Sequence, residues 1–166
     1  MTFENIRTKT IRFALAMLFV GLAVGVYTRE SFRPLEKILD PTTLELVRGR
    51  DFVTHGHAIV YGFALPLLLL GASALLKERF DGKAWQAVNK AFVLAAVGVV
   101  LTLALTLYKS SALVFALAAN PAAPLPAIDA SLFGGVRGLR EALHTIAHAL
   151  FGVGYVWWGA KLWKRA

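Results

Sequence analysis

Cysteine is absent from the 166-residue chain. Without thiols the protein forms no disulfide, binds no metal through sulfur, holds no iron–sulfur cluster and attaches no c-type haem covalently. Any metal centre must therefore use nitrogen or oxygen ligands. The chain also lacks Walker-type, G-x-G-x-x-G and H-E-x-x-H motifs and any serine triad with a suitable nucleophile, so the common signatures of nucleotide binding and hydrolysis are missing.

Charged residues are scarce, at 17% of the chain, whereas hydrophobic residues make up 57%. A soluble domain alternates polar and apolar positions, but this chain gathers its apolar residues into long runs. Four runs approach the roughly 20 residues that a helix needs to cross a bilayer. We therefore predict one all-α domain, residues 1–166, that forms an integral membrane four-helix bundle of up-down topology with spans at about 12–28, 52–76, 91–110 and 142–162.

Basic residues outnumber acidic ones and give a net charge of +8. They flank the apolar runs and form no stripe or tail, so membrane topology explains them better than nucleic-acid binding, and no nucleic-acid partner is predicted. Lys and Arg are dense in the N-terminal segment, the second connection and the C-terminal segment. The positive-inside rule then places both termini in the cytoplasm. A cleaved signal peptide is the rival interpretation of the first run, but Val26-Tyr27-Thr28 offers no A-x-A cleavage site.

The chain has four histidines in two short clusters, His55 and His57 in V-T-H-G-H-A, and His144 and His148 in L-H-T-I-A-H-A. Both clusters lie near the start of an apolar run, where burying an imidazole is costly. The second and fourth spans enter the membrane from the same side. With a rise of about 1.5 Å per residue, His57 and His148 lie about 8 Å and about 9 Å inside their spans. The clusters are therefore predicted to meet in the outer leaflet.

Helical spacing selects among the four imidazoles. His144 and His148 are separated by four residues and share one helix face. His55 and His57 are about 200° apart on an ideal helix, so only one faces the bundle interior. We favour His57, which lies deeper and has Tyr61 one turn on. Two small residues beyond the histidines, Gly62 and Gly152, leave room for a flat ligand.

Haem b is the first cofactor that this arrangement suggests. Two neutral imidazoles can bind the iron from opposite faces of the porphyrin, inside an apolar bundle. The propionates then need cations, for which Arg29 and Lys109 lie at the right level. The predicted function is electron transfer or small-molecule redox chemistry, with a quinone or a redox protein as partner. If the protein is an enzyme, it is a haem-dependent oxidoreductase.

Three alternatives remain open from the residues alone. A copper or zinc ion could be bound by three or four imidazoles from His55, His57, His144 and His148, with Glu30 or Glu141 nearby, in a metal-binding or transport protein. The protein could instead be a structural subunit of a membrane complex. The histidines could also only form hydrogen bonds between helices. The oligomeric state is left open.

The connections give smaller signals. Pro66 predicts a kink inside the second span, with the freed carbonyl satisfied by a neighbouring helix. The first connection, 31–51, is expected to contain a short helix at 42–48, capped by Asp40 or Thr42, that covers the site as a lid. Residues 111–119 are apolar and extend the third helix beyond Lys109.

Three segments carry a resemblance to a known family. They are Val26-Tyr27-Thr28-Arg29-Glu30, then His55-Gly56-His57 with Gly62, and then His148-Ala149-Leu150-Phe151-Gly152-Val153-Gly154. In this order they resemble a family of small, uncharacterised bacterial four-helix membrane proteins, a domain of unknown function, over nearly the whole chain. A basic residue near Lys109 fits the family, whereas His144 has no counterpart in it. The resemblance implies a multi-pass protein of the bacterial inner (plasma) membrane. The histidine-then-glycine pattern is also similar to haem-binding helices of respiratory membrane proteins.

Overall fold

The protein is all-α, as predicted. The computed structural model describes the backbone of residues 1–166 and every side chain except those of Arg50 and Asp51. The helical elements in chain order are α1 (Phe3–Leu35), α2 (Pro41–Gly56), the π-helix η1 (His57–Ala64), α3 (Leu65–Leu75), the short 3₁₀ turn η2 (Lys77–Arg79), α4 (Gly82–Ala119), α5 (Leu125–Ser131), the 3₁₀ turn η3 (Leu132–Gly135) and α6 (Arg137–Trp163).

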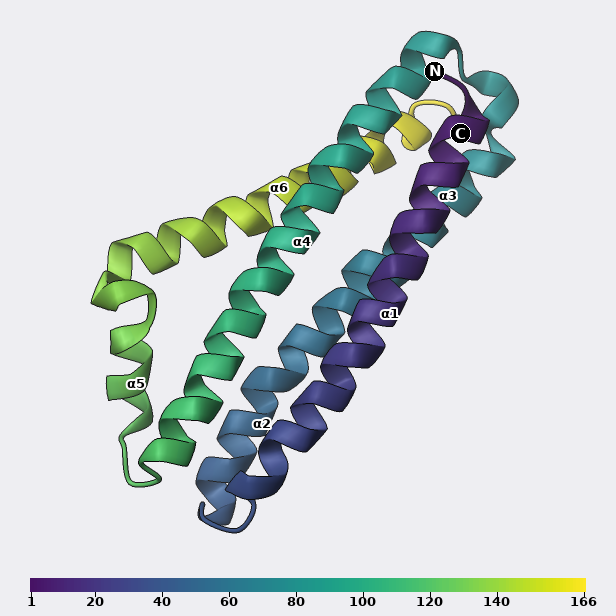
Figure 1. Cartoon of the computed structure of the whole chain (residues 1–166). Coiled ribbons are helices and arrows are strands. Elements are labelled where there is room, and N and C mark those ends of the chain that lie inside the picture. The colour runs from purple at the N-terminus through teal and green to yellow at the C-terminus, as the bar shows by residue number, and fades with distance from the viewer.

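These elements build an elongated bundle in which α2, η1 and α3 follow one another without a break and run antiparallel to α1 (Figure 1). Both chain termini lie at the same end of the bundle, beside the turn η2. The guanidinium of Arg79 in η2 donates hydrogen bonds to the carbonyls of Arg165 and Ala166, at 2.6 and 2.7 Å. The three basic segments of the sequence are therefore gathered at one end.

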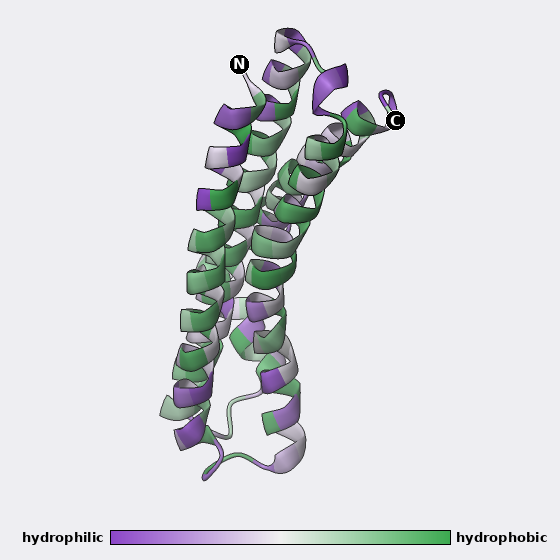
Figure 2. Ribbon diagram, turned by 90° about the vertical axis from the view of Figure 1, so that its right-hand side faces the viewer, coloured by the Kyte–Doolittle hydropathy of each residue, from purple (hydrophilic) through white to green (hydrophobic). Residues whose placement is uncertain are grey.

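Three helical stretches are long and apolar enough to cross a membrane: Phe3–Leu35, Pro41–Leu75 and Gly82–Ala119. They contain the first and third predicted spans and all but the last residue of the second, 52–76. Apolar residues follow the middle of the long helices and polar residues gather at the ends (Figure 2). Many large apolar side chains on their outer surfaces are exposed, among them Leu68 at 70% and Leu75 at 87%. Such a surface suits contact with lipid.

The fourth predicted span, 142–162, lies inside α6, which does not belong to that apolar set. Its first five residues include Arg137, Arg140 and Glu141, and its apolar part is diluted by two histidines and several glycines. α6 nevertheless runs along α4, and the two helices diverge toward α5 (Figure 1). The structure thus has three helical stretches that could span a membrane, with α6 packed against the third.

The first connection does not contain the separate short helix that was predicted at 42–48 as a lid over the site. α2 begins at Pro41, capped by the Asp40 carboxylate, which accepts from the backbone N–H groups of Thr42 and Thr43 at 3.0 Å. It then continues into η1, so the stretch 42–48 is the first part of a long helix. The side chains of Arg50 and Asp51, at the end of that predicted connection, lie outside the described set. The prediction that the third helix extends beyond Lys109 is confirmed, because α4 ends at Ala119.

Glycine sets the spacing between helices at two crossings. A Cβ on Gly154 of α6 would lie 2.5 Å from the backbone nitrogen of Ala95 in α4, so only glycine fits. A Cβ on Gly21 of α1 would lie 2.7 Å from Ile59 in η1. Close backbone approach through small residues is typical of membrane helix pairs. These crossings hold α6 on α4 and η1 on α1.

Candidate functional site

The helix that carries His55 and His57 changes its hydrogen-bond register at His57. The segment His57–Ala64 is a π-helix, and at its end the Leu65 N–H donates to the carbonyl of Val60, five residues earlier. Pro66 explains the change in part, because it has no N–H to donate to the preceding turn. π-helical turns inside α-helices are rare in proteins, and those that occur are often found at functional sites. The predicted Pro66 kink is therefore a π-helical segment that begins at a candidate ligand.

The π-helix leaves the carbonyl of Tyr61 without a backbone donor, since its partner five residues on is Pro66. The hydroxyl of Tyr155 in α6 donates a hydrogen bond to this carbonyl. Tyr155 is 7% exposed. An unpaired carbonyl in this setting would cost about 1–3 kcal/mol. The bond also fixes the position of α6 relative to η1, two helical turns from His148 on the same face.

His57 and His148 come together. Their ring centroids lie 5.7 Å apart and the rings are nearly perpendicular, at 85°. Tyr61 and Phe151 flank the pair, with Tyr61 5.3 Å from His57 and Phe151 5.3 Å from His148, measured between ring centroids. His57 is half-buried and His148 is exposed on the open side of the pair. The two helices that the sequence predicted to carry the ligands therefore present their imidazoles to each other.

All four histidines use Nδ1 in the same way. Nδ1 of His57 lies 2.7 Å from the carbonyl of Val53, and Nδ1 of His148 lies 2.8 Å from the carbonyl of His144. Nδ1 of His144 is 2.9 Å from the Arg140 carbonyl, and Nδ1 of His55 is 2.8 Å from the Gly21 carbonyl. A carbonyl only accepts, so each Nδ1 carries a proton, and in the neutral form of the ring the lone pair is on Nε2. Metal-binding histidines are commonly oriented by a hydrogen bond of this kind.

A cavity of about 290 Å³ lies beside the pair and brings three histidines together. It is lined by Val53 and His57, by Thr106, Lys109, Ser110 and Leu113 of α4, and by His144 and His148 of α6. Lys109 also pairs with Asp129 of α5, with Nζ 3.6 Å from Oδ1. Gly152, one turn from His148, has open space where a Cβ would stand. The cavity thus combines three imidazoles with one ammonium group.

The three imidazoles of this cavity do not form a metal cage. Within the described side chains no three histidine or carboxylate groups converge closely enough to hold one ion. The acids named with the metal alternative are engaged elsewhere: Glu30 pairs with Arg33 at 2.7 Å, and Glu141 accepts from Arg137 at 2.7 Å. That hydrogen bond and the positive charge of Arg137 hold the pKa of Glu141 below its ordinary value.

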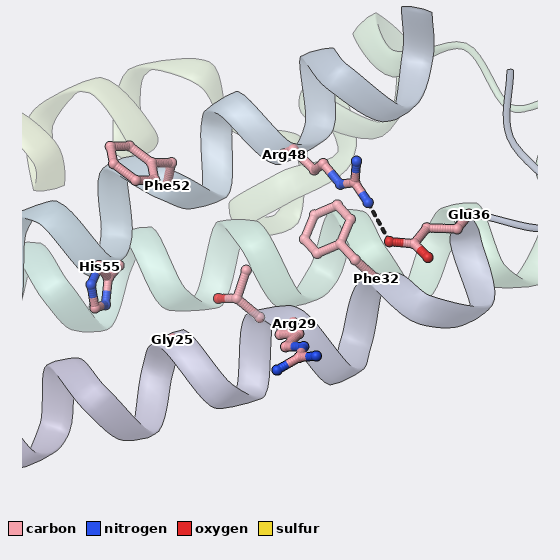
Figure 3. A pocket seen from close by; sticks show the side chains of 8 residues that line it. Gly25, Arg29, Phe32, Glu36, Arg48, Phe52 and His55 are labelled. Atoms are coloured by element: carbon pink, nitrogen blue, oxygen red, sulfur yellow. Dashed lines mark hydrogen bonds and ion pairs between the residues drawn. The ribbon is translucent and has the colours of Figure 1, made fainter. Parts of the chain in front are cut away.

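His55 and Arg29 belong to a second cavity on the other side of the α2 helix. This cavity, of about 370 Å³, lies between α1 and α2 and is lined by Gly25, Thr28, Arg29, Phe32, Glu36, Arg48, Phe52 and His55 (Figure 3). Arg29 is therefore not placed to pair with a ligand between His57 and His148. Gly62 also differs from the expectation, because a Cβ there would lie 2.8 Å from Met17 of α1. Gly62 serves helix packing, and Gly152 alone leaves room beside the pair.

Comparison with known proteins identifies the family. A family model described as protein of unknown function (DUF2871) matches residues 7–164. The chain belongs to this family. The match covers nearly the whole chain, in agreement with the resemblance seen in the sequence. No curated protein and no solved structure matches the chain.

Sequence reasoning missed two features of this region. The role of Tyr155 depends on the π-helical register, and the only signal for it was the proline at position 66. The second cavity was missed because Arg29 and His55 were assigned to the same site as His57. The 200° separation of His55 and His57 was the signal that these residues face different neighbours.

Proposed function

We propose that this protein binds haem b through His57 and His148 and transfers electrons at the membrane. The observation that carries the proposal is the approach of two imidazole rings, 5.7 Å apart, from separate helices, each with its Nε2 lone pair available. Two neutral imidazoles on opposite faces of a porphyrin complete the coordination of haem iron.

The separation of the rings supports a shared metal. Two metal–nitrogen bonds of about 2 Å, together with about 1 Å from each nitrogen to its ring centre, place two imidazole centres about 6 Å apart on one ion. The observed distance between the His57 and His148 centroids is 5.7 Å. The centroid separation is thus close to that expected of two imidazoles on one ion.

The number of ligands favours haem over a bare ion. Copper and zinc sites built from imidazole use three or four protein ligands, and among the described residues no group of three is available. A porphyrin supplies four nitrogens of its own, so two histidines are sufficient. The porphyrin is larger than the cavity of about 290 Å³, so it would extend through the open side at His148 and Gly152. Lys109, which also pairs with Asp129, is the cation that lines this cavity and could pair with a propionate.

We propose that the protein crosses the bacterial inner membrane four times, with α6 as the fourth span and both termini in the cytoplasm. The three basic segments lie at one end of the bundle, as the positive-inside rule requires of a cytoplasmic face. The histidines then lie nearer the outer face. α6 is a poorer span by composition, but it packs on α4 through Gly154 and Gly98, and a bound haem would cover its histidines.

An absorption spectrum of the detergent-purified protein from haem-replete cells tests the proposal. We expect a Soret band that is lost in His57→Ala and in His148→Ala. His55→Ala is the matched histidine control, because its ring bonds to Gly21 of α1, and it should keep the band. Each variant is checked by size-exclusion chromatography and circular dichroism. Partial recovery of the band when imidazole is added to His148→Gly would separate ligand loss from misfolding. A colourless protein that also fails to bind added haemin, or a band that survives in both variants, would overturn the proposal.

A further inference from the structure

We propose that the second cavity, between α1 and α2, binds the head group of a quinone. The electron transfer that we infer from this site rests on the proposed haem function, but the binding of the quinone does not depend on haem. The cavity has a volume of about 370 Å³, within the size of small-molecule sites, and although five of its eight lining residues are polar, most of the surface that they present to it is apolar. It lies on two helices long and apolar enough to cross a membrane, so a lipid-soluble ligand would reach it from the bilayer.

The polar groups of the cavity match a ring with two carbonyl oxygens. Arg29 forms no ion pair or hydrogen bond with any side chain that the structure describes, so its guanidinium is available as a donor. The hydroxyl of Thr28 is buried and, among the described residues, has no hydrogen-bond partner. An unsatisfied buried polar atom requires an explanation, and a ligand carbonyl is one. These two donors lie on adjacent residues of α1.

His55 provides the proton acceptor that the oxidation of a hydroquinone requires. Its Nδ1 donates to the Gly21 carbonyl at 2.8 Å, so Nε2 is left to accept a proton. Gly25 permits this placement, because a Cβ there would lie 3.2 Å from Nδ1 of His55. Figure 3 shows His55 at one end of the cavity, with Arg29 and Phe32 farther along α1. Phe32 is 3% exposed and forms an inner aromatic wall, while Phe52 is 72% exposed and borders the opening.

The charge of the cavity favours a neutral ring over an anion. Arg48 at the far end is neutralised by an ion pair with Glu36, which leaves Arg29 as the one unpaired cation among the described lining residues. The carboxylate of Glu36 would repel a phosphate group. A quinone carries no charge and needs donors at its oxygens, which suits a mostly apolar cavity with a few polar groups.

The two cavities touch the same helical turn, because His55 lines one, His57 lines the other and Gly56 lies between them. Oxidation of a hydroquinone breaks two O–H bonds and yields a quinone, two protons and two electrons. The protons leave through Nε2 of His55, one after the other. A haem held by His57 and His148 would accept these electrons one at a time, so one hydroquinone would reduce two equivalents of haem-loaded protein.

The test measures binding and electron transfer separately. Binding of decylubiquinone, a short-chain benzoquinone, is measured by equilibrium dialysis of the purified full chain in detergent, with or without haem. We expect Arg29→Gln and His55→Gln to weaken binding at least tenfold. Arg33→Gln is the matched control, since it removes the same charge one turn along α1, outside the cavity. Thr28→Val, which keeps the shape of the side chain, should weaken binding by a smaller factor.

The second measurement is the rate at which decylubiquinol reduces the Soret band. We expect Arg29→Gln and His55→Gln to keep the haem band and to lose at least nine-tenths of this rate, with two haems reduced per quinol in the unmodified protein. A protein without haem that still binds quinone would refute the haem proposal and keep this one. Three results would overturn the quinone site. Decylubiquinone does not bind, or its binding is the same in all variants, or Arg29→Gln loses a bound anionic phospholipid and keeps its affinity for the quinone.

Discussion

The two faces of the helix around Gly56 differ in what their histidines contact. On one face, His55 reaches across to the backbone of α1 and is held by the Gly21 carbonyl at 2.8 Å. On the other, His57 bonds within its own helix to Val53 and meets the imidazole of His148, 5.7 Å away. Both rings have the same tautomer, so their chemistry is set by their neighbours. The first face offers one imidazole with an arginine, and the second offers two imidazoles from different helices.

The largest expected effect comes from changing the glycine contact between α4 and α6, because this contact positions the helix that carries His148. In Gly154→Ala the new Cβ would lie 2.5 Å from the Ala95 nitrogen and 2.7 Å from the Ala91 carbonyl oxygen. Both obstacles are backbone atoms, so α6 must move. We expect a loss toward the upper end of about 1–3 kcal/mol in the free energy of unfolding, with loss of haem. Chemical unfolding in mixed micelles measures the first and the Soret band the second.

Gly159→Ala is the control for this change, since nothing lies within 4 Å of a Cβ at that position of the same helix. Alanine favours a helix over glycine by about 0.8–1.0 kcal/mol, so we expect a gain of stability. Equal losses in the two variants would show that helix propensity, and not the crossing, explains the result.

The hydroxyl of Tyr155 gives the next largest effect. In Tyr155→Phe the Tyr61 carbonyl loses its donor, which we expect to cost about 1 kcal/mol and to accelerate haem loss, because α6 is no longer fixed to η1. Tyr27→Phe is the matched control, because Tyr27 of α1 contacts α4 away from both histidine cavities. Its hydroxyl donates to Ser111 at 2.9 Å in an exposed position, so its removal should cost less and leave haem in place. A faster loss of haem in Tyr27→Phe than in Tyr155→Phe would contradict this assignment.

Much of this arrangement was predictable from the sequence, and the reasons differ by feature. Span parity and depth placed His57 and His148 together, because rise per residue and the direction of each helix are fixed by simple geometry. The spacing of His144 and His148 put both on the face that lines the cavity. Arg29 lines the other cavity, which the sequence did not indicate because depth alone does not say which side of a helix a residue from another helix meets.

The π-helix and the continuity of α2 with it could not be predicted from the sequence, for another reason. Hydrophobic periodicity reports which residues are buried, but η1 depends on which carbonyl each N–H selects, and Tyr155 supplies part of the answer from more than ninety residues away. The segment 42–48 has a capped helix start, which was recognised, but no glycine–proline break follows it before the second span. Nothing then ends the helix, so the short helix and the span are one.

The smallest expected effect is on the rate of haem dissociation, when the basic residue of each face, Lys109 or Arg29, is replaced. Lys109 lines the cavity of the second face and pairs with Asp129, with side chains that are 33% and 21% exposed. Lys109→Gln removes the cation that we propose for a propionate, and pairs of this kind contribute about 0.2–1 kcal/mol. We expect haem to dissociate about two- to threefold faster, a change of about 0.5 kcal/mol. Arg29→Gln, on the first face, should leave the dissociation rate unchanged. Transfer of haem to excess apomyoglobin measures both rates. A larger effect from Arg29 than from Lys109 would mean that the haem edge reaches the α1 side, and that the two faces share one ligand.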